Sequence, residues 1–143
     1  MFELHPQLQA DCLVVGDFPL SRLLLLNDKH YPWFVLVPRR QGLREVFELG
    51  AQDRAQFHCE SDRLAELLSA EFKADKMNVA ALGNMVPQLH VHHVVRFRGD
   101  AAWPAPVWGK VPAIPYSESE LAAMLTRVRA LLVGELAFAE VQS

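Results

Sequence analysis

Three of the six histidines of this chain lie within four consecutive positions, at His90, His92 and His93. The apolar residues around them predict a strand over residues 88–97, in which successive side chains point to opposite faces. Gln88, His90 and His92 then share one face, and His93 points to the other. An amide and two imidazoles make a poor core face, because each polar group would cost free energy if it were buried without a partner. This face is therefore the candidate reactive surface.

The two imidazoles on this face suit chemistry at phosphorus. A neutral imidazole such as that of His90 is a competent nucleophile when one ring nitrogen is free and the other donates its proton to a fixed acceptor. His92 lies about 6–7 Å further along the predicted strand, so it can bind a phosphoryl oxygen or protonate a leaving group. Upstream, Gly83 allows a close backbone approach and Asn84 adds amide donors for anionic oxygens. These residue types favour phosphoryl or nucleotidyl transfer, in which positioning and charge stabilisation dominate.

The stretch from Gln88 to Arg96, preceded by the segment 83–87 (Gly-Asn-Met-Val-Pro), resembles the signature of the histidine triad (HIT) family. That signature reads His-x-His-x-His, is followed by apolar residues and often an arginine, and has a Gly-containing phosphate loop before it. When Arg96 is aligned with the basic residue, the triad positions become Gln88, His90 and His92. A register that starts at His90 would place a valine third and is the less favoured one.

The resemblance implies a mechanism and a role for each matching residue. HIT enzymes attack the α-phosphate of a nucleotide with the central histidine, release the leaving group, and pass the nucleotidyl group from histidine to water or another acceptor. His90 is then the nucleophile, His92 contacts the phosphate or leaving group, and Gln88 replaces a histidine that supports the nucleophile. The implied substrate is a dinucleoside polyphosphate or a nucleoside phosphoramidate-type conjugate. The implied substrate-binding positions are Asn27 or Asp28 at the ribose, and Asn78, Gly83 and Asn84 at the phosphate.

Other functions stay open beside this hydrolase or transferase. Gln88 cannot titrate, so the chain could be a nucleotide-binding module with weak turnover. His90 and His92 could instead bind zinc with His30 or an acidic residue, although no suitably spaced third ligand is evident. The resemblance itself implies no metal and no cofactor, because histidine and amide donors carry the charge. His93, among apolar neighbours on the other face, is expected to be a hydrogen-bonded core residue.

The elements that position these residues follow from the apolar patterns. Candidate strands cover residues 12–15, 20–26, 33–37, 77–82 and 88–97, the second and third forming an antiparallel hairpin. A short helix is expected over residues 43–49, and Asp53 is the expected cap of a main helix ending near Phe72. Ser117 and Glu120 form a capping box that opens a final helix. This order predicts an α+β fold with a five-stranded antiparallel sheet, a main helix and a C-terminal helix, as the HIT resemblance also implies.

Length and composition indicate one domain over residues 1–143, with 51% hydrophobic and 22% charged residues. The HIT resemblance covers about residues 8–110, and the final helix, about residues 117–133, lies outside it. The net charge of −3 argues against an extended nucleic-acid footprint, and no apolar run approaches the roughly 20 residues of a membrane span. Lone Cys12 and Cys59 and the lack of a secretory signal predict a cytoplasmic protein. The family resemblance implies a homodimer.

Overall fold

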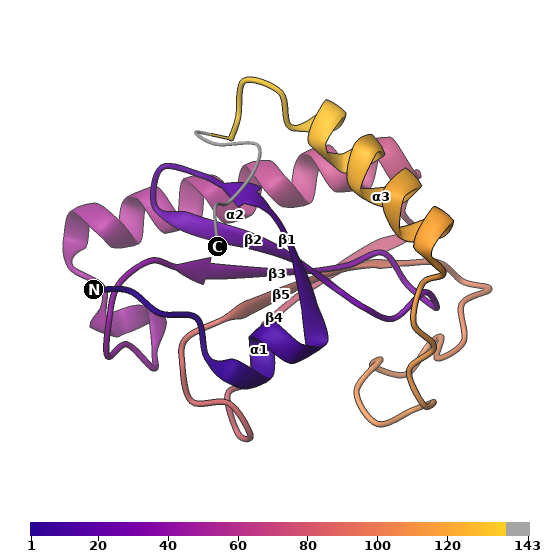
Figure 1. The fold of residues 1–143 in the computed structure, drawn as a ribbon, viewed down its shortest axis with the longest axis horizontal. Coiled ribbons are helices and arrows are strands. Elements are labelled where there is room, and N and C mark those ends of the chain that lie inside the picture. Colours follow the sequence, from indigo (N-terminus) through magenta and orange to yellow (C-terminus); the bar gives the residue numbers. More distant parts are fainter. Residues whose placement is uncertain (137–143) are drawn as a thin grey trace.

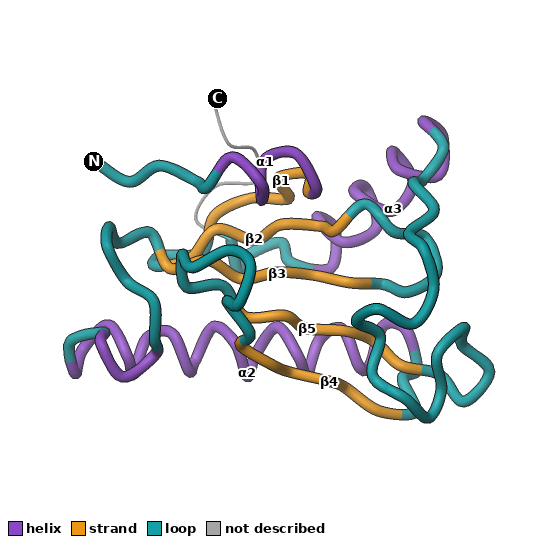
Figure 2. Tube along the Cα trace, turned by 90° about the horizontal axis from the view of Figure 1, so that it is seen from below, coloured by secondary structure: helices purple, strands orange, loops and turns teal. Residues whose placement is uncertain are grey.

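The computed structural model describes residues 1–136, which form five β-strands and three α-helices (Figure 1). The strands are β1 (Cys12–Asp17), β2 (Ser21–Leu26), β3 (Trp33–Pro38), β4 (Lys76–Ala81) and β5 (Val91–Arg96). The helices are α1 (Pro6–Asp11), α2 (Ala51–Phe72) and α3 (Glu118–Leu131). The strands lie side by side in one antiparallel sheet in the order β1-β2-β3-β5-β4 (Figure 2). The predicted α+β fold is confirmed.

The sheet is covered on both faces, which is why its central strands are continuous apolar runs rather than alternating ones. On one face, Leu23, Phe34 and Val95 pack against α2 and α3, where Leu64 and Val128 are fully buried. Figure 2 shows α2 running along the sheet on this side. The face with α2 therefore holds the larger core.

The opposite face carries the smaller core. Here Leu24, Val35 and Val94 pack with Leu8 of α1 and with Val107 of the segment that follows β5. The sequence pattern did not predict α1, because its six residues are too few to show a period. The helix is instead started by local chemistry, since proline stands at its first position and the His5 side chain accepts a hydrogen bond from the Gln7 amide.

Helix α2 differs from the prediction at its start. It begins at Ala51 with Gly50 as the capping residue, so the expectation that Asp53 caps it was wrong. Asp53 lies in the first turn, where its carboxylate forms an ion pair with Arg40 at 2.7 Å. The short helix expected over residues 43–49 is also wrong, because only Val46–Glu48 forms a single 3-10 turn.

Helix α3 begins as predicted. The Ser117 hydroxyl accepts a hydrogen bond from the Glu120 amide at 3.2 Å, and the Glu120 carboxylate accepts one from the Ser117 amide at 2.9 Å. The helix ends at Leu131, two residues before the predicted end.

Strand β5 is shorter than the predicted strand 88–97. The ladders to β3 and β4 both begin at Val91, and the amide of Leu89 donates to the carbonyl of Leu43 at 2.9 Å instead of to a neighbouring strand. Gln88 and His90 therefore lie just before β5, outside the sheet ladder, and the chain bends at Gln88. The rings of His90 and His92 still lie side by side, with their centroids 5.1 Å apart, as expected for residues on one face.

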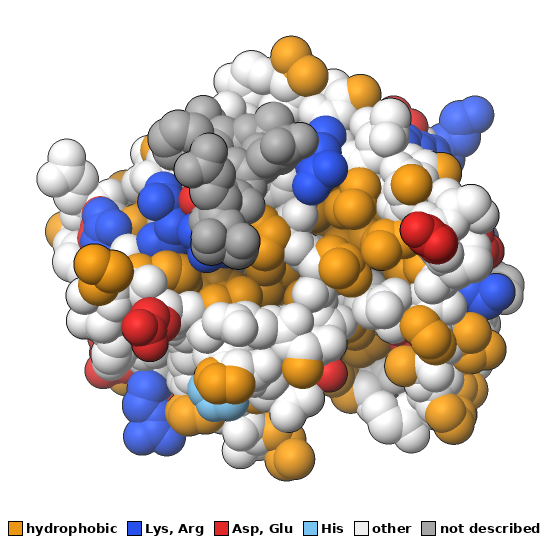
Figure 3. Space-filling view, in the orientation of Figure 1, with side chains coloured by type: hydrophobic (Ala, Val, Ile, Leu, Met, Phe, Trp, Pro, Cys, Tyr) orange, Lys and Arg blue, Asp and Glu red, His pale blue; other side chains and the backbone are white. Residues whose placement is uncertain are grey.

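The segment between β5 and α3 has no helix or strand, as its prolines predicted. It is held against the sheet by Arg96, whose guanidinium forms a buried ion pair with Asp100 at 2.8 Å and donates to the carbonyl of Ala105 at 2.8 Å. Figure 3 shows apolar side chains gathered where Figure 1 places this segment. Residues 100–108 thus form a wall beside the face that carries His92.

Candidate active site

His90 presents a free ring nitrogen as a result of its hydrogen bonding. Its Nδ1 lies 2.6 Å from the backbone carbonyl oxygen of Gln88. A carbonyl oxygen only accepts, so Nδ1 carries the proton and Nε2 carries the lone pair. Only 6% of the residue is exposed, and Nε2 has no hydrogen-bond partner within residues 1–136. This is the tautomer that a nucleophilic imidazole needs.

His92 is held in the opposite tautomer. The indole Nε1–H of Trp33 donates to His92 Nδ1 at 2.9 Å, and an indole can only donate. Nδ1 therefore carries the lone pair and Nε2 carries the proton. Burial, and after it the proximity of His90 and His93, lowers the pKa of His92 to about 4. His92 is thus a neutral hydrogen-bond donor at ordinary pH.

The two rings form one unit with complementary outer atoms. Their centroids are 5.1 Å apart and their planes are tilted by 73°. An electron-pair donor at His90 Nε2 and an N–H donor at His92 Nε2 can therefore approach a single tetrahedral phosphorus centre, one at phosphorus and the other at an oxygen. Such positioning is the main protein contribution to phosphoryl transfer.

Two tryptophans enclose His92. The ring of Trp33 lies 5.7 Å from that of His92, and the ring of Trp108, from the wall segment, lies 5.2 Å from it. The two indoles also touch each other edge to face at 5.7 Å. The sequence alone did not single out Trp33, because its relation to His92 depends on β3 pairing with β5, where Val35 lies opposite His92. Trp33 lies two residues before Val35, on the same face of β3, so its side chain is the diagonal neighbour of His92.

His93 lies on the other face, as its position in the strand predicts. It is fully buried against α2, its Nδ1 donates to the carbonyl of Val91 at 3.0 Å, and Nε2 accepts from the Ser61 hydroxyl at 2.7 Å. Burial lowers the pKa of His93 to about 4. Both ring nitrogens are occupied, so His93 has no atom left for a ligand.

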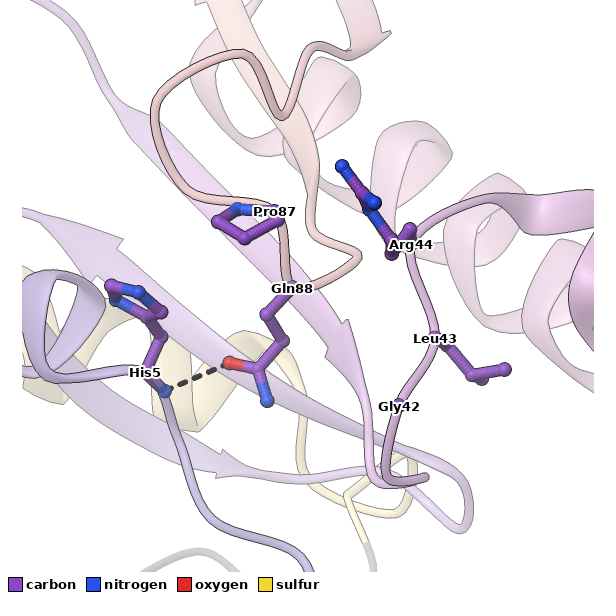
Figure 4. A pocket seen from close by; sticks show the side chains of 6 residues that line it. All are labelled: His5, Gly42, Leu43, Arg44, Pro87 and Gln88. Atoms are coloured by element: carbon purple, nitrogen blue, oxygen red, sulfur yellow. Dashed lines mark hydrogen bonds between the residues drawn. The ribbon is translucent and has the colours of Figure 1, made fainter.

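The side chain of Gln88 is bonded to the N-terminal segment and makes no hydrogen bond to the His90 ring; Figure 4 shows it pointing to the His5 backbone. Its Oε1 accepts from the His5 amide at 2.8 Å, and its Nε2 donates to the carbonyl of Glu3 at 2.8 Å. It is the backbone carbonyl of Gln88, not the side chain, that contacts His90. Beside Gln88 lies a cleft of about 410 Å³, whose far wall comes from residues 42–44 and whose near wall comes from His5 and Pro87.

The residues predicted at the ribose lie together at the end of β2. Asn27 Oδ1 accepts from the amide of Tyr116 at 3.0 Å, and Asp28 Oδ1 accepts from the amide of His30 at 3.0 Å. The Asn27 bond, with a bond from the Lys29 amide to the Ile114 carbonyl at 2.8 Å, attaches residues 114–116 to the β2–β3 turn. The amide nitrogen of Asn27 and the second carboxylate oxygen of Asp28 make no hydrogen bond within the described chain, although Asp28 is only 4% exposed.

The residues predicted at the phosphate are placed less compactly. Asn78 lies on β4 opposite Val94, and its Oδ1 accepts from Arg96 at 2.7 Å, so its oxygen is committed to the support of the wall segment. Gly83 adopts a φ of +77°, in the left-handed region that glycine favours, and begins the β4–β5 loop. Asn84 beside it is exposed and makes no hydrogen bond to another described residue.

The chain lacks a ready-made metal site in its described part. Residues 1–136 contain no group of three or more His, Cys, Asp or Glu side chains that could hold a metal ion. The zinc alternative for His90 and His92 therefore finds no third ligand there. No helix in this part of the chain is long and apolar enough to cross a membrane.

Known proteins resemble this chain over nearly its whole length. A family model described as the HIT domain matches residues 7–99. The structure is similar to a histidine triad protein from Marinobacter aquaeolei VT8, with 49% identity, a TM-score of 0.92, and coverage of 94% of this chain and 98% of that one. A histidine triad protein from Bradyrhizobium japonicum is 43% identical, with a TM-score of 0.88 and coverage of 90% and 96%. One from Sinorhizobium meliloti 1021 is 40% identical, with a TM-score of 0.89 and coverage of 92% and 98%. Comparison with curated proteins gave no match.

Proposed function

This chain belongs to the HIT family, whose members are nucleotide hydrolases and transferases, and from that premise we propose that it transfers a nucleoside monophosphoryl group through His90. The substrate is a dinucleoside polyphosphate or a nucleoside phosphoramidate-type conjugate. The observation that carries the proposal is the pair of opposite tautomers, with a lone pair on His90 Nε2 and a proton on His92 Nε2. Gln88 takes the place of the first triad histidine.

In this mechanism, His90 Nε2 attacks the α-phosphorus and forms the N–P bond while the bond to the leaving group breaks. The His90 ring then carries a positive charge, which the carbonyl of Gln88 stabilises through the Nδ1–H bond. His92 Nε2–H donates to a phosphoryl oxygen on which charge gathers. Water then attacks phosphorus and loses a proton to the solvent, while the N–P bond breaks with its electron pair returning to His90 Nε2, which restores neutral His90 and releases the nucleoside monophosphate.

The rest of the substrate follows from the surroundings of the two histidines. Asn27 and Asp28 offer free polar atoms for ribose hydroxyls at the end of β2. Asn84 and the backbone at Gly83 supply donors for phosphate oxygens, and Asn78 supports them through its bond to Arg96.

The experiment that tests the function is a search for the covalent intermediate. The protein is mixed with a dinucleoside polyphosphate labelled at the α-phosphate and quenched with base, which leaves a phosphoramidate bond to histidine intact. Label on the wild-type chain and none on His90→Asn is the expected result. His58→Asn is the matched control, because His58 is exposed on α2 and away from the site. Turnover by His90→Asn equal to that of wild type would refute the assignment.

A nucleotide-binding module is the second candidate, and the observation in its favour is the Gln88 side chain. That side chain makes no bond to the His90 ring, so it offers no titrating partner to the nucleophile. Under this alternative, a nucleoside monophosphate binds with the same contacts, while the labelling experiment and a steady-state assay both give no product.

We also propose a cytoplasmic homodimer. β4 is an edge strand of the sheet. Val79 on this strand and Leu82, the residue that follows the strand, are each 48% exposed. An unpaired edge with apolar side chains is a surface on which a second copy can add its own strand. Light scattering should give twice the chain mass for wild type and the chain mass for Val79→Lys. Two free cysteines, Cys12 and Cys59, suit a reducing compartment.

A further inference from the structure

The hydrogen bond between Trp33 and His92 restricts what His92 can do. Trp33 is 6% exposed and His92 7%, so water does not compete for the 2.9 Å bond between them. A second proton on His92 would have to sit on Nδ1, pointing at the indole N–H. Two donors would then face each other in a buried place, which costs the full desolvation of both groups.

The other groups around His92 give no compensation for a positive charge. Its titratable neighbours are His93, next to it on β5, and His90, just before that strand, and both disfavour a further charge. β4 places Ala80 opposite it, and the wall segment contributes the uncharged ring of Trp108. His92 therefore stays neutral, and only its Nε2–H faces the substrate.

We propose that Trp33 is a positioning residue that keeps His92 as a neutral donor, and that this makes the site selective for phosphoanhydride substrates. The inference rests on the proposed function and narrows it. In a phosphoanhydride, the P–O bond breaks with its electron pair on a phosphate oxygen, and the leaving nucleotide departs as an anion without taking a proton. In an alkyl phosphoramidate, the leaving amine must be protonated as the P–N bond breaks. A neutral imidazole is a poor acid for that step, because it would become an imidazolate.

The first test reads the tautomer directly and does not depend on activity. Nitrogen-15 NMR of the imidazole rings should show His92 protonated only on Nε2 from about pH 5.5 to 8, since burial beside Trp33 lowers its pKa from the ordinary 6.5 to about 4. In Trp33→Phe, which keeps an aromatic ring but removes the donor, His92 should populate both tautomers and titrate at a higher pH. Trp108→Phe is the control, because the Trp108 indole N–H makes no hydrogen bond within the described residues and the His92 tautomer should not change.

The second test measures selectivity. Wild type should have a kcat/KM for a dinucleoside polyphosphate about 10²-fold above that for an alkyl phosphoramidate of the same nucleoside, the low end of what a general acid contributes. Below pH 6, Trp33→Phe should shift this ratio toward the phosphoramidate. Trp33→Met serves in both tests if the phenylalanine variant does not fold.

The results distinguish the role of Trp33 in holding His92 from the selectivity for phosphoanhydrides. A protonated His92, or one with its proton on Nδ1, in wild type at pH 6 would overturn the role of Trp33. The expected NMR pattern with equal kcat/KM for both substrates would overturn the selectivity. The same pattern with no turnover of either substrate would overturn the selectivity and the proposed function together, and the positioning of His92 by Trp33 would stand.

Discussion

Replacing Gln88 with alanine should destabilise the fold far more than it slows the chemistry. The side chain makes two hydrogen bonds of 2.8 Å, to the His5 amide and to the Glu3 carbonyl, and it is only partly buried. A typical intramolecular hydrogen bond contributes about 0.5–1.5 kcal/mol, so the loss should be about 1–3 kcal/mol. For a chain of about this length, each kcal/mol lowers Tm by about 2–4 °C.

Catalysis should survive the same change, because His90 is oriented by the backbone carbonyl of Gln88, which alanine retains. We expect kcat to stay within about threefold of wild type, which is less than 1 kcal/mol in the barrier. Urea titration gives the free energy of unfolding, and steady-state kinetics under conditions where each variant is folded gives kcat. Gln88→Met keeps the apolar stem and removes both hydrogen bonds, so it separates hydrogen bonding from packing. A hundredfold loss of kcat with unchanged stability would refute the reasoning and show that the amide acts on His90 directly.

Two further predictions concern stability. The pKa values of His92 and His93, about 4 in the fold, lie below the unfolded value near 6.5, so the unfolded chain binds more protons between these limits. The contribution of the two neutral histidines to the free energy of unfolding should therefore be fully present above pH 6.5 and be lost as the pH drops to 4, by on the order of 3 kcal/mol per histidine. In urea titrations over this pH range, His93→Asn should lose about half as much stability as wild type. Arg96→Met should cost about 3–5 kcal/mol, because it leaves the Asp100 carboxylate buried without its cation, whereas Arg63→Met, which breaks exposed ion pairs, should cost less than about 1 kcal/mol in the same urea titration.

The sequence was sufficient for the architecture because its signals are local and agree with each other. The apolar runs and the capping box at Ser117 each specify an element without knowledge of the others. The start of α2 was mispredicted because the side chain of Asp53 has a partner distant in sequence, Arg40, that competes with capping. The shortening of β5 follows from the ends of β3 and β4, which a single-strand pattern does not contain.

The site was predictable only as far as strand alternation reaches. Alternation separates His90 and His92 from His93, and the structure keeps that separation. It does not show that a tryptophan from another strand fixes the tautomer of His92, because that contact needs the strand order. Nor does it show that the Gln88 side chain forms hydrogen bonds with the N-terminal segment, since no pattern in residues 1–5 indicates where that segment packs. The roles given to Asn27, Asp28, Asn78, Gly83 and Asn84 stay predictions.

The neighbours His92 and His93 have the same side chain and opposite surroundings, and only the pleat of β5 tells them apart. Shifting β5 by one residue against β3 would bring His93 toward Trp33 and His92 toward Ser61, with no change in composition. Insertion or deletion of one residue within this strand should therefore abolish activity even where the fold tolerates it. Insertion or deletion of two residues keeps each histidine on its own face of the sheet. Related chains can be expected to vary in the length of the flanking loops and to keep the spacing within the strand.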